Sequence, residues 1–232
     1  MGTLVEDRSL RNQRYVFKDR AEAGRSLAQK LSHAISADAM VFAIPAGGVP
    51  VACEVARDLK LSMDLMIVRK VQIPGDPEAG FGAIGPDGEV ILNEKLFRQL
   101  RLTEKEIKQQ VEEARKVLLA RNQLFRKGKP FPQVKDRLVI LVDDGLASGF
   151  TMTEAVRFMK KRGAKKIIVA VPTAPAESVD RLLPNVDMLY CLNLRTFSPF
   201  AVAEAYENWY DLTDQEVISM LKTYDISMNL GP

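Results

Sequence analysis

The sequence predicts an α/β fold, with a mostly parallel central sheet that carries helices on both faces. Short apolar runs alternate along the chain with segments whose apolar residues recur every three or four positions, as strands alternate with helices. The clearest run, residues 138–142, holds five consecutive apolar residues and is typical of a strand buried on both faces. With 232 residues, 47% of them hydrophobic, the chain can build a full core, and we expect one domain over residues 1–232.

The first half of the chain predicts two strands, three helices and a hairpin. The strands are the apolar runs at residues 41–44 and 65–68. The helices follow capping residues or glycines: Asp19 to Ile35 with Glu22 completing a capping box, a helix after Gly47-Gly48, and a long helix from Thr103 with Glu106 completing its cap. Residues 71–92 are rich in Gly and Pro and end in an apolar run, which predicts a flexible hairpin around Pro86-Asp87-Gly88.

The second half continues the alternation of strands and helices. Its expected elements are the strand at 138–142, a helix that opens at Thr151 with Glu154 as a capping box, strands at 167–171 and 188–192, a short helix after Pro175, and a terminal helix from about Thr213. In open α/β sheets, ligands bind beyond the carboxyl ends of the strands. The loops that follow the strands are therefore where we expect a site.

Two carboxylates and a glycine-bounded loop follow the strand at 138–142. Asp143 and Asp144 end the strand, and Gly145 to Gly149 lead into a helix. The loop N–H groups and the helix dipole favour a phosphate, and the carboxylates suit sugar hydroxyls or a metal ion. Such acids also cap turns or bind Mg²⁺ in receiver domains and phosphatases, but a receiver carries its pair near the N-terminus and a haloacid-dehalogenase phosphatase needs Asp-x-Asp. The segment therefore predicts a site for a phosphorylated sugar.

A second loop is expected beside the first. Ala46-Gly47-Gly48 follows the strand at 41–44, and its glycines let the backbone present N–H groups to an anion. Arg69-Lys70 closes the strand at 65–68, and both side chains are expected to reach the same crevice. Alone, the glycines are equally consistent with a tight turn, and the two cations are also consistent with solvated charges. Beside the acidic pair, a binding site is favoured.

Composition disfavours several classes of protein. A net charge of +3 is too small for a nucleic-acid binder, no run of about 18 apolar residues is present to span a membrane, and the polar N-terminus lacks a secretory signal, so we expect a cytoplasmic protein. The single histidine, His33, lies far from the motifs, and Cys53 and Cys191 lie in apolar segments, which disfavours a catalytic triad, a zinc site or a disulfide. Residues 80–85 match a dinucleotide fingerprint in letters only, because neither a strand before them nor a helix after them is predicted.

The stretch from Val142 to Thr151 resembles the phosphoribosyl-pyrophosphate (PRPP) binding motif of type I phosphoribosyltransferases, with Ser148 where the family most often has Thr. The resemblance covers about Asp19 to Leu221 and points to stand-alone members with Pro-x-Gly-Gly and Val-Arg-Lys-Val in the first half. It implies an Mg²⁺-dependent transferase of nucleotide metabolism, which moves 5-phosphoribose from PRPP to a nitrogenous base or related nitrogen acceptor and releases pyrophosphate.

The resemblance also implies roles for the residues of both loops. Asp143, Asp144, Arg69 and Lys70 would be catalytic, and the two acids would meet Mg²⁺ indirectly, through ribose hydroxyls and water. The 5-phosphate would be bound by Gly145, Ala147, Ser148, Gly149, Phe150 and Thr151, and pyrophosphate by Ala46, Gly47 and Gly48. Thr151 would either cap its helix or bind phosphate. The hairpin would close over the substrate, and a hood within about 194–232 would read the acceptor through Phe197 and Phe200, which are equally consistent with core residues.

The chain departs from the family pattern at Ala46, where many relatives carry Arg. A charge-assisted hydrogen bond is worth roughly 1.5–3 kcal/mol, so its loss would weaken pyrophosphate binding unless Arg69 or Lys70 compensates. Ala46 mildly favours an alternative function, a non-catalytic regulatory protein that senses PRPP or a nucleotide, while the retained acids favour catalysis. The expected partners are small-molecule substrates, with a homodimer as one candidate assembly.

Overall fold

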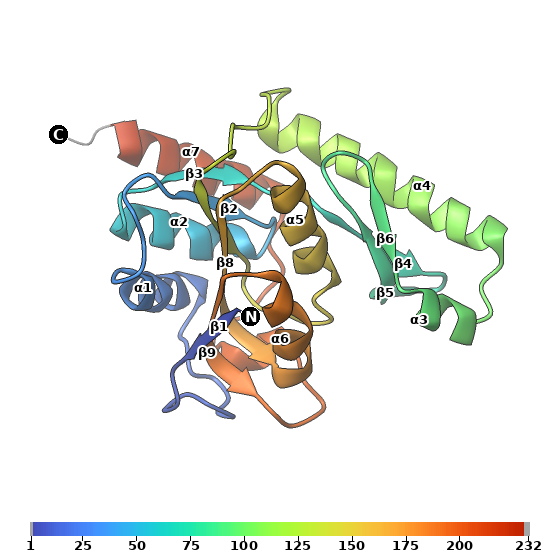
Figure 1. Ribbon diagram of the computed structural model, residues 1–232, viewed down its shortest axis with the longest axis horizontal. Helices are drawn as coiled ribbons and strands as arrows, with labels where there is room; N and C mark the ends of the chain where they lie inside the picture. Colours follow the sequence, from blue (N-terminus) through green and yellow to red (C-terminus); the bar gives the residue numbers. More distant parts are fainter. Residues whose placement is uncertain (1, 230–232) are drawn as a thin grey trace.

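Six parallel strands form the central sheet of the computed structural model, which describes residues 2–229 (Figure 1). In order across the sheet they are β1 (Thr3–Glu6), β9 (Met188–Arg195), β8 (Lys166–Pro175), β7 (Leu138–Val142), β2 (Met40–Ala43) and β3 (Ser62–Leu65). Every neighbouring pair is parallel, which confirms the predicted sheet. The sequence does not predict the edge strand β1, because only two of its four residues are apolar and they form no run like that of β2.

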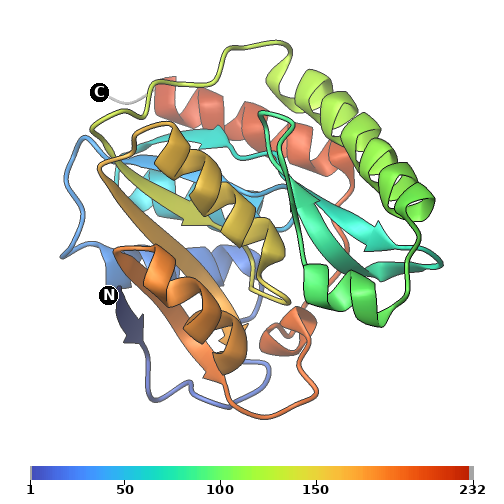
Figure 2. The same cartoon turned by 45° about the vertical axis from the view of Figure 1, so that its right-hand side comes forward.

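Hydrophobic clusters on the two faces of this sheet form the core. Ile140 and Val142 belong to one cluster, and Val139 and Leu141 to the other, so β7 is apolar throughout because both of its faces are buried. The helices α1 (Arg20–Leu31) and α2 (Gly48–Asp58) cover one face, with α7 (Asp214–Asn229) packed against α2, and α5 (Phe150–Lys161) and α6 (Ala176–Leu182) cover the other (Figures 1 and 2). Helices on both faces are thus confirmed.

A second, antiparallel sheet stands beside the first and contains the predicted hairpin (Figure 2). Its strands are β4 (Arg69–Ile73), β5 (Asp76–Ile84) and β6 (Val90–Leu92), and the helices α3 (Glu94–Gln99) and α4 (Glu104–Arg121) follow. A π-helical turn, η1 (Asn122–Arg126), continues from α4. Because β5 and β6 pair on either side of the turn at residues 85–89, the predicted hairpin is confirmed.

The predicted strand at residues 65–68 is wrong. β3 ends at Leu65, and Arg69 and Lys70 begin β4 of the other sheet rather than closing a strand of the central one. The intervening residues Met66 to Val68 cross between the two sheets and are all buried. A buried connection needs the same apolar residues as a buried strand, so sequence periodicity cannot separate the two.

Helix starts follow the predicted caps in most places. Thr103 and Glu106 exchange hydrogen bonds at the start of α4, and Thr213 and Glu216 do so at the start of α7. The expected capping box of α5 is wrong. This helix begins at Phe150, after Gly149 in a left-handed conformation (φ 77°), and no side chain caps it. Glu154 is instead fully buried and accepts hydrogen bonds from Arg157 one turn later.

The remaining differences are small. α1 begins after its predicted cap, Asp19, but ends at Leu31 rather than at residue 35. Two short 3₁₀ helices, η2 (Leu183–Asn185) and η3 (Val202–Ala205), complete the elements. Within residues 2–229, none of the helices combines the length and the apolar character that crossing a bilayer would require.

The start of α1 yields a first prediction, because it sets the position of Arg20. Asp19 Oδ1 accepts a hydrogen bond of 2.9 Å from the backbone N–H of Glu22. Removing the acceptor with Asp19→Ala should lower the free energy of unfolding by about 1 kcal/mol, as measured by urea denaturation. Asp19→Asn keeps the acceptor and should lose much less. Equal losses in the two variants would contradict this role of the cap.

Candidate functional site

The two loops singled out in the sequence lie side by side because β2 and β7 are neighbours in the sheet. Ala43 pairs with Val142 at the carboxyl ends of these strands, and the backbone N–H of Ile44 donates to Val142 O at 2.9 Å. A cavity of about 710 Å³ opens beyond this edge. The expected site residues that line it are Ala46, Gly47, Arg69, Lys70, Asp143, Asp144, Gly145, Ala147, Ser148, Gly149 and Thr151.

Close packing, rather than a turn alone, requires the glycines of the first loop. A Cβ atom on Gly47 would overlap the Asp144 carboxylate. One on Gly48 would lie 2.7 Å from Val142 O and 2.9 Å from Asp143 Cα. Gly48 therefore does not line the cavity. As the first residue of α2, it packs against the backbone of Val142 and Asp143.

The loop between β7 and α5 is fixed through its carbonyl groups. Ser178 Oγ donates to Ala147 O at 2.6 Å, and Arg181 Nη1 donates to Ser148 O at 2.7 Å, both from α6. In a planar trans peptide the next residue's N–H points opposite to the carbonyl. The N–H groups of Ser148 and Gly149 therefore point away from α6, as an anion site at the start of α5 requires.

Arg20, at the start of α1, holds the second acid of the pair. Its Nε donates to Asp144 Oδ2 at 2.9 Å, its Nη1 donates to Tyr210 O at 2.9 Å, and its guanidinium carbon lies 3.9 Å from the centroid of the Trp209 ring. The Arg20 side chain is 8% exposed and that of Asp144 is 13% exposed. The hydroxyl of Tyr206 donates to the Asp144 carbonyl at 2.6 Å. Asp144 is thus fixed by side chain and backbone alike.

Burial dominates the electrostatics of the acidic pair. It raises the pKa of Asp143 well above the ordinary value, and the neighbouring Asp144 raises it further. Burial also raises the pKa of Asp144, while Arg20 opposes the change. The pair is therefore a poorly solvated concentration of negative charge, which a ligand hydroxyl or a positive charge would stabilise.

Cations face the acids from the second sheet. Arg69 and Lys70, at the start of β4, both line the cavity. Burial lowers the pKa of Arg69, with a further contribution from Arg121, which also lines the cavity and pairs with Asp214 at 3.1 Å. A guanidinium remains charged at neutral pH in spite of such a shift. The cavity thus has one acidic and one basic wall.

The expected acceptor residues lie outside this cavity. Phe197 and Phe200 line a neighbouring cavity of about 580 Å³, and so does Phe150, which was expected at the 5-phosphate. The two cavities share Gly80, Leu96, Ala147 and Ser148. Phe197 is 69% exposed, so it is not a core residue. Thr151 lies inside the first turn of α5 and lines the larger cavity, and it does not cap the helix.

The family of this chain follows from its match to a model described as the phosphoribosyl transferase domain, over residues 17–207. The chain belongs to this family. The matched range includes both loops of the cavity, the hairpin and Arg20. The fold class of this phosphoribosyl transferase chain agrees with the one that the sequence predicts.

Several known proteins are similar to this phosphoribosyl transferase chain. Two Mycobacterium tuberculosis proteins (strains CDC 1551 / Oshkosh and ATCC 25618 / H37Rv), each named "Putative phosphoribosyl transferase", are 37% identical over 211 residues, which are 89% of this chain and 46% of the relative. The chain therefore spans about half the length of these relatives. The crystal structure of TT1426 from Thermus thermophilus matches with a TM-score of 0.72 and 35% identity, covering 90% of this chain and 98% of that one. A stretch of 41 residues, 18% of this chain and 21% of the relative, is 44% identical to the transcriptional regulator GfcR of Methanosphaera stadtmanae.

Sequence reasoning missed the residues that hold the loops of the candidate site. Trp209 and Ser178 carried no signal, because their contacts form only in the folded chain. Arg20 did carry one, since a cation in the first turn of a helix opposes the helix dipole and calls for an acidic partner. Asp144 is that partner.

The raised pKa of Asp143 predicts a pH-dependent effect of Asp143→Asn. A carboxyl whose pKa is raised above the ordinary 3.8 stabilises the fold most when protonated and loses this contribution as pH rises through the folded-state pKa. The variant should therefore unfold at a higher urea concentration than the wild type at pH 7, and the difference should vanish as pH falls towards 3.8.

The measurement is made with a chelator present throughout, and it has one control variant. The isosteric Asn can still accept the hydrogen bond of 2.9 Å that Asp143 Oδ1 receives from the backbone N–H of Asp144. Asp180→Asn, at an exposed position of α6, should show no such pH-dependent gain. A variant of Asp143 that is less stable than the wild type at pH 7 would contradict the electrostatic description of the pair.

Proposed function

We propose that this chain transfers 5-phosphoribose from PRPP to a nitrogenous acceptor and releases pyrophosphate. One observation carries the proposal: a single cavity is lined by the acidic pair, by the loop before α5 and by the Ala46-Gly47 loop facing Arg69. A phosphorylated sugar with two anionic ends matches this arrangement. Membership in the phosphoribosyl transferase family supports the reaction class.

The loop before α5 would bind the 5-phosphate. The N–H groups of Ser148 and Gly149 point away from their tethers on α6, and they are available in place without rearrangement of the loop. The Ser148 and Thr151 hydroxyls would add hydrogen bonds, and Gly145, Ala147 and Phe150 would contribute through their backbone. Charge-assisted hydrogen bonds of this kind are among the strongest in proteins.

Asp143 and Asp144 would hold the ribose hydroxyls and stabilise the positive charge that builds on the ring as the C1–O bond breaks. Because both carboxylates are poorly solvated, a developing cation beside them is stabilised more than it would be in water. Arg20 keeps Asp144 in one orientation, so little reorganisation is needed at the moment of reaction.

Ala46 and Gly47, with Arg69 and Lys70 lining the same cavity, would receive the pyrophosphate, whereas the N–H of Gly48 already donates to Ile44 O at 3.0 Å. The missing Arg at position 46 is offset by the cations of the basic wall, which line the same cavity. A leaving group of high negative charge is stabilised by fixed cations of this kind. The other turn of this sheet, between β4 and β5, is flanked by Ile73 and Gly80, which line the cavity, and would cover the reactants.

The residues also fit a magnesium ion that arrives with the substrate. Within residues 2–229, no three His, Cys, Asp or Glu side chains are grouped so as to hold a metal ion. Mg²⁺ commonly binds through one or two carboxylates together with substrate phosphates. Asp143 and Asp144 would contact it indirectly, through ribose hydroxyls and water, and the ion would supply charge neutralisation for the pyrophosphate.

The acceptor would lie in the neighbouring cavity, between Phe197 and Phe200. Its walls continue from the larger cavity through Ala147 and Ser148, so an acceptor bound there would reach the ribose. The exposed ring of Phe197 could stack on a planar base. The hood would then comprise the segment after β9, within residues 194–232 of a single domain.

A regulatory function is the alternative, and Ala46 is the observation that favours it. In that case the cavity would bind PRPP or a nucleotide without turnover, and the short match to a transcriptional regulator is compatible with this. The two functions are separated by one assay. Pyrophosphate release from PRPP is measured with Mg²⁺ across a panel of purine, pyrimidine and simpler nitrogen acceptors. Binding of PRPP without release for any acceptor would favour the regulatory function.

Binding of PRPP is the prediction shared by both functions. At 100 times its dissociation constant, a ligand adds roughly 2.7 kcal/mol to the free energy of unfolding. PRPP with Mg²⁺ should therefore raise the melting temperature by several degrees in a thermal-shift assay. Ribose without phosphate serves as the control and should have little effect. The absence of any shift with PRPP, ribose 5-phosphate or nucleoside monophosphates would reject the site.

Neutralising both acids tests whether they are needed for catalysis but not for folding. The double variant Asp143→Asn with Asp144→Asn should lower the rate of pyrophosphate release by about 10²–10³-fold, because it removes the charges that stabilise the transition state. Circular dichroism checks that the fold is retained, and Asp180→Asn provides a matched change of charge on the surface. Wild-type turnover in the folded double variant would show that other residues carry the reaction.

A further inference from the structure

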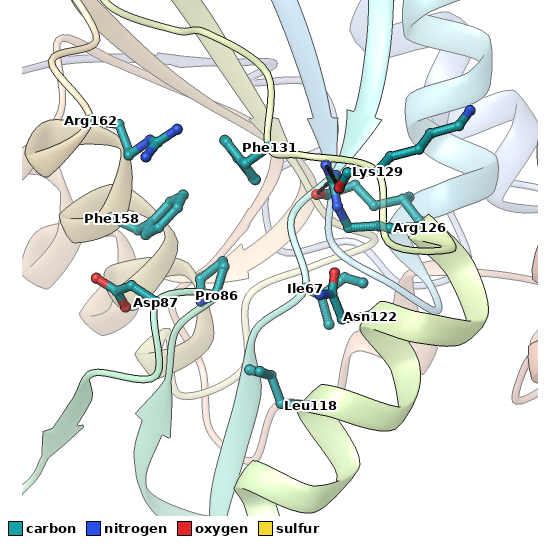
Figure 3. Close-up of a pocket in the computed structure, with 11 residues that line it drawn as sticks. Ile67, Pro86, Asp87, Leu118, Asn122, Arg126, Lys129, Phe131, Phe158 and Arg162 are labelled. Atoms are coloured by element: carbon teal, nitrogen blue, oxygen red, sulfur yellow. Dashed lines mark hydrogen bonds between the residues drawn. The ribbon is translucent and has the colours of Figure 1, made fainter.

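A third cavity lies beside the β5–β6 turn, at the opposite end of α5 from the candidate site (Figure 3). Its volume is about 270 Å³, slightly below the range of roughly 300–1,000 Å³ that is usual for drug-sized ligands. One wall consists of Phe158 from α5 and Pro86 from the hairpin turn, and the facing wall of Leu118 from α4 and Ile67. None of these residues lines the candidate site.

The floor of this cavity is apolar and aromatic. The ring of Phe131 stacks on Phe42 with centroids 5.3 Å apart and planes at 7°, and it meets Phe158 edge-on at 4.9 Å. Phe158 is 4% exposed and Leu118 is equally buried. These rings are fixed by their neighbours, so a planar apolar group could pack against them without rearrangement of the core.

The charges at the rim favour an anion. Two acidic side chains lie close, but both are already neutralised: Asp64 pairs with Arg126, and Asp87 pairs with Lys161 at 3.1 Å and with Arg157 at 3.3 Å. Arg162 forms no ion pair with any residue in the described part of the chain, and its guanidinium lies 5.7 Å from the Phe131 ring centroid and 5.9 Å from that of Phe158. A cation over the aromatic floor is therefore available to a ligand.

The same cavity touches the turn between β5 and β6, in the sheet that carries Arg69 and Lys70. Asp87 and Glu89, in the hairpin turn, pair with Arg157 and Lys161 on α5. Gly85 packs so closely on buried Glu154 that an added Cβ would overlap its carboxylate. A ligand between Pro86 and Leu118 would therefore contact both this turn and α4.

We propose that this cavity is a second ligand site, which takes a small, flat aromatic carboxylate. The ring packs against Phe131 and Phe158, and the carboxylate pairs with Arg162. The volume limits the ligand to one ring or two small fused rings. Binding there does not require PRPP, because this cavity and the candidate site share no lining residue.

Three single-ring probes test the site, namely benzoate, neutral benzamide and cationic benzamidine. They differ in charge and little in shape. Each is titrated at constant ionic strength into the ¹⁵N-labelled full chain, and backbone amide shifts are recorded. The expected result is saturable binding of benzoate with shifts centred on Phe131 and Phe158, in the millimolar range. Benzamide should bind more weakly, and benzamidine at least about tenfold more weakly than benzoate.

Arg162→Gln is the decisive variant, and Lys160→Gln is its control. Both residues are exposed at the end of α5, and both changes remove one positive charge, but only Arg162 lines the cavity. Arg162→Gln should weaken benzoate at least about fivefold, and Lys160→Gln less than twofold. Equal effects of the two variants would overturn the proposal, as would equal affinities for benzoate and benzamidine, the absence of saturable binding, or shifts centred on residues 143–151.

Discussion

The contact between the Gly47 backbone and the Asp144 carboxylate is the constraint on which the candidate site depends. It brings the loop after β2 against the loop after β7, and there is no space for a side chain at Gly47. The parallel pairing of β2 and β7 makes this approach possible, because it places the two loops at the same edge of the sheet. A backbone suited to anions and a pair of acids, which attract opposite kinds of group, are thereby held within one cavity.

Arg20 offsets part of the free-energy cost of burying the two carboxylates. Two carboxylates removed from water are costly, and one guanidinium cannot neutralise both. Of the two acids, Arg20 bonds only to Asp144, while the carboxylate of Asp143 accepts the backbone N–H of its neighbour. Burial therefore disfavours the charged form of Asp143, to which Arg20 does not bond directly. Such an unfavourable arrangement is typical of residues held in place for binding rather than for stability.

The sequence was sufficient for the parts of this structure that depend on local pattern. The strand at 138–142, the capped starts of α4 and α7, and the hairpin follow from apolar periodicity and turn residues. The connection at Met66 to Val68 was predicted as part of a strand. Its residues are apolar because they are buried, and a buried segment needs apolar residues whether or not it pairs in a sheet. The predicted start of α5 was also wrong. Of the two residues that suggested a capping box, Thr151 lines the cavity and Glu154 packs against Gly85 beside the hairpin turn. The tethers from Ser178 and the stacking of Trp209 on Arg20 depend on residues distant in the chain, and a single sequence contains no record of such contacts.

The ion pairs between the β5–β6 turn and α5 make the attachment of this turn sensitive to salt. Glu89 and Lys161 are each half exposed, and exposed pairs are worth at most about 1 kcal/mol apiece and weaken as salt is added. The turn is therefore held by interactions that solvent ions can replace, whereas the apolar residues beneath it are indifferent to ionic strength. Concentrated salt should therefore weaken the attachment of this turn to α5, while the close packing of Gly85 on the buried Glu154 is retained.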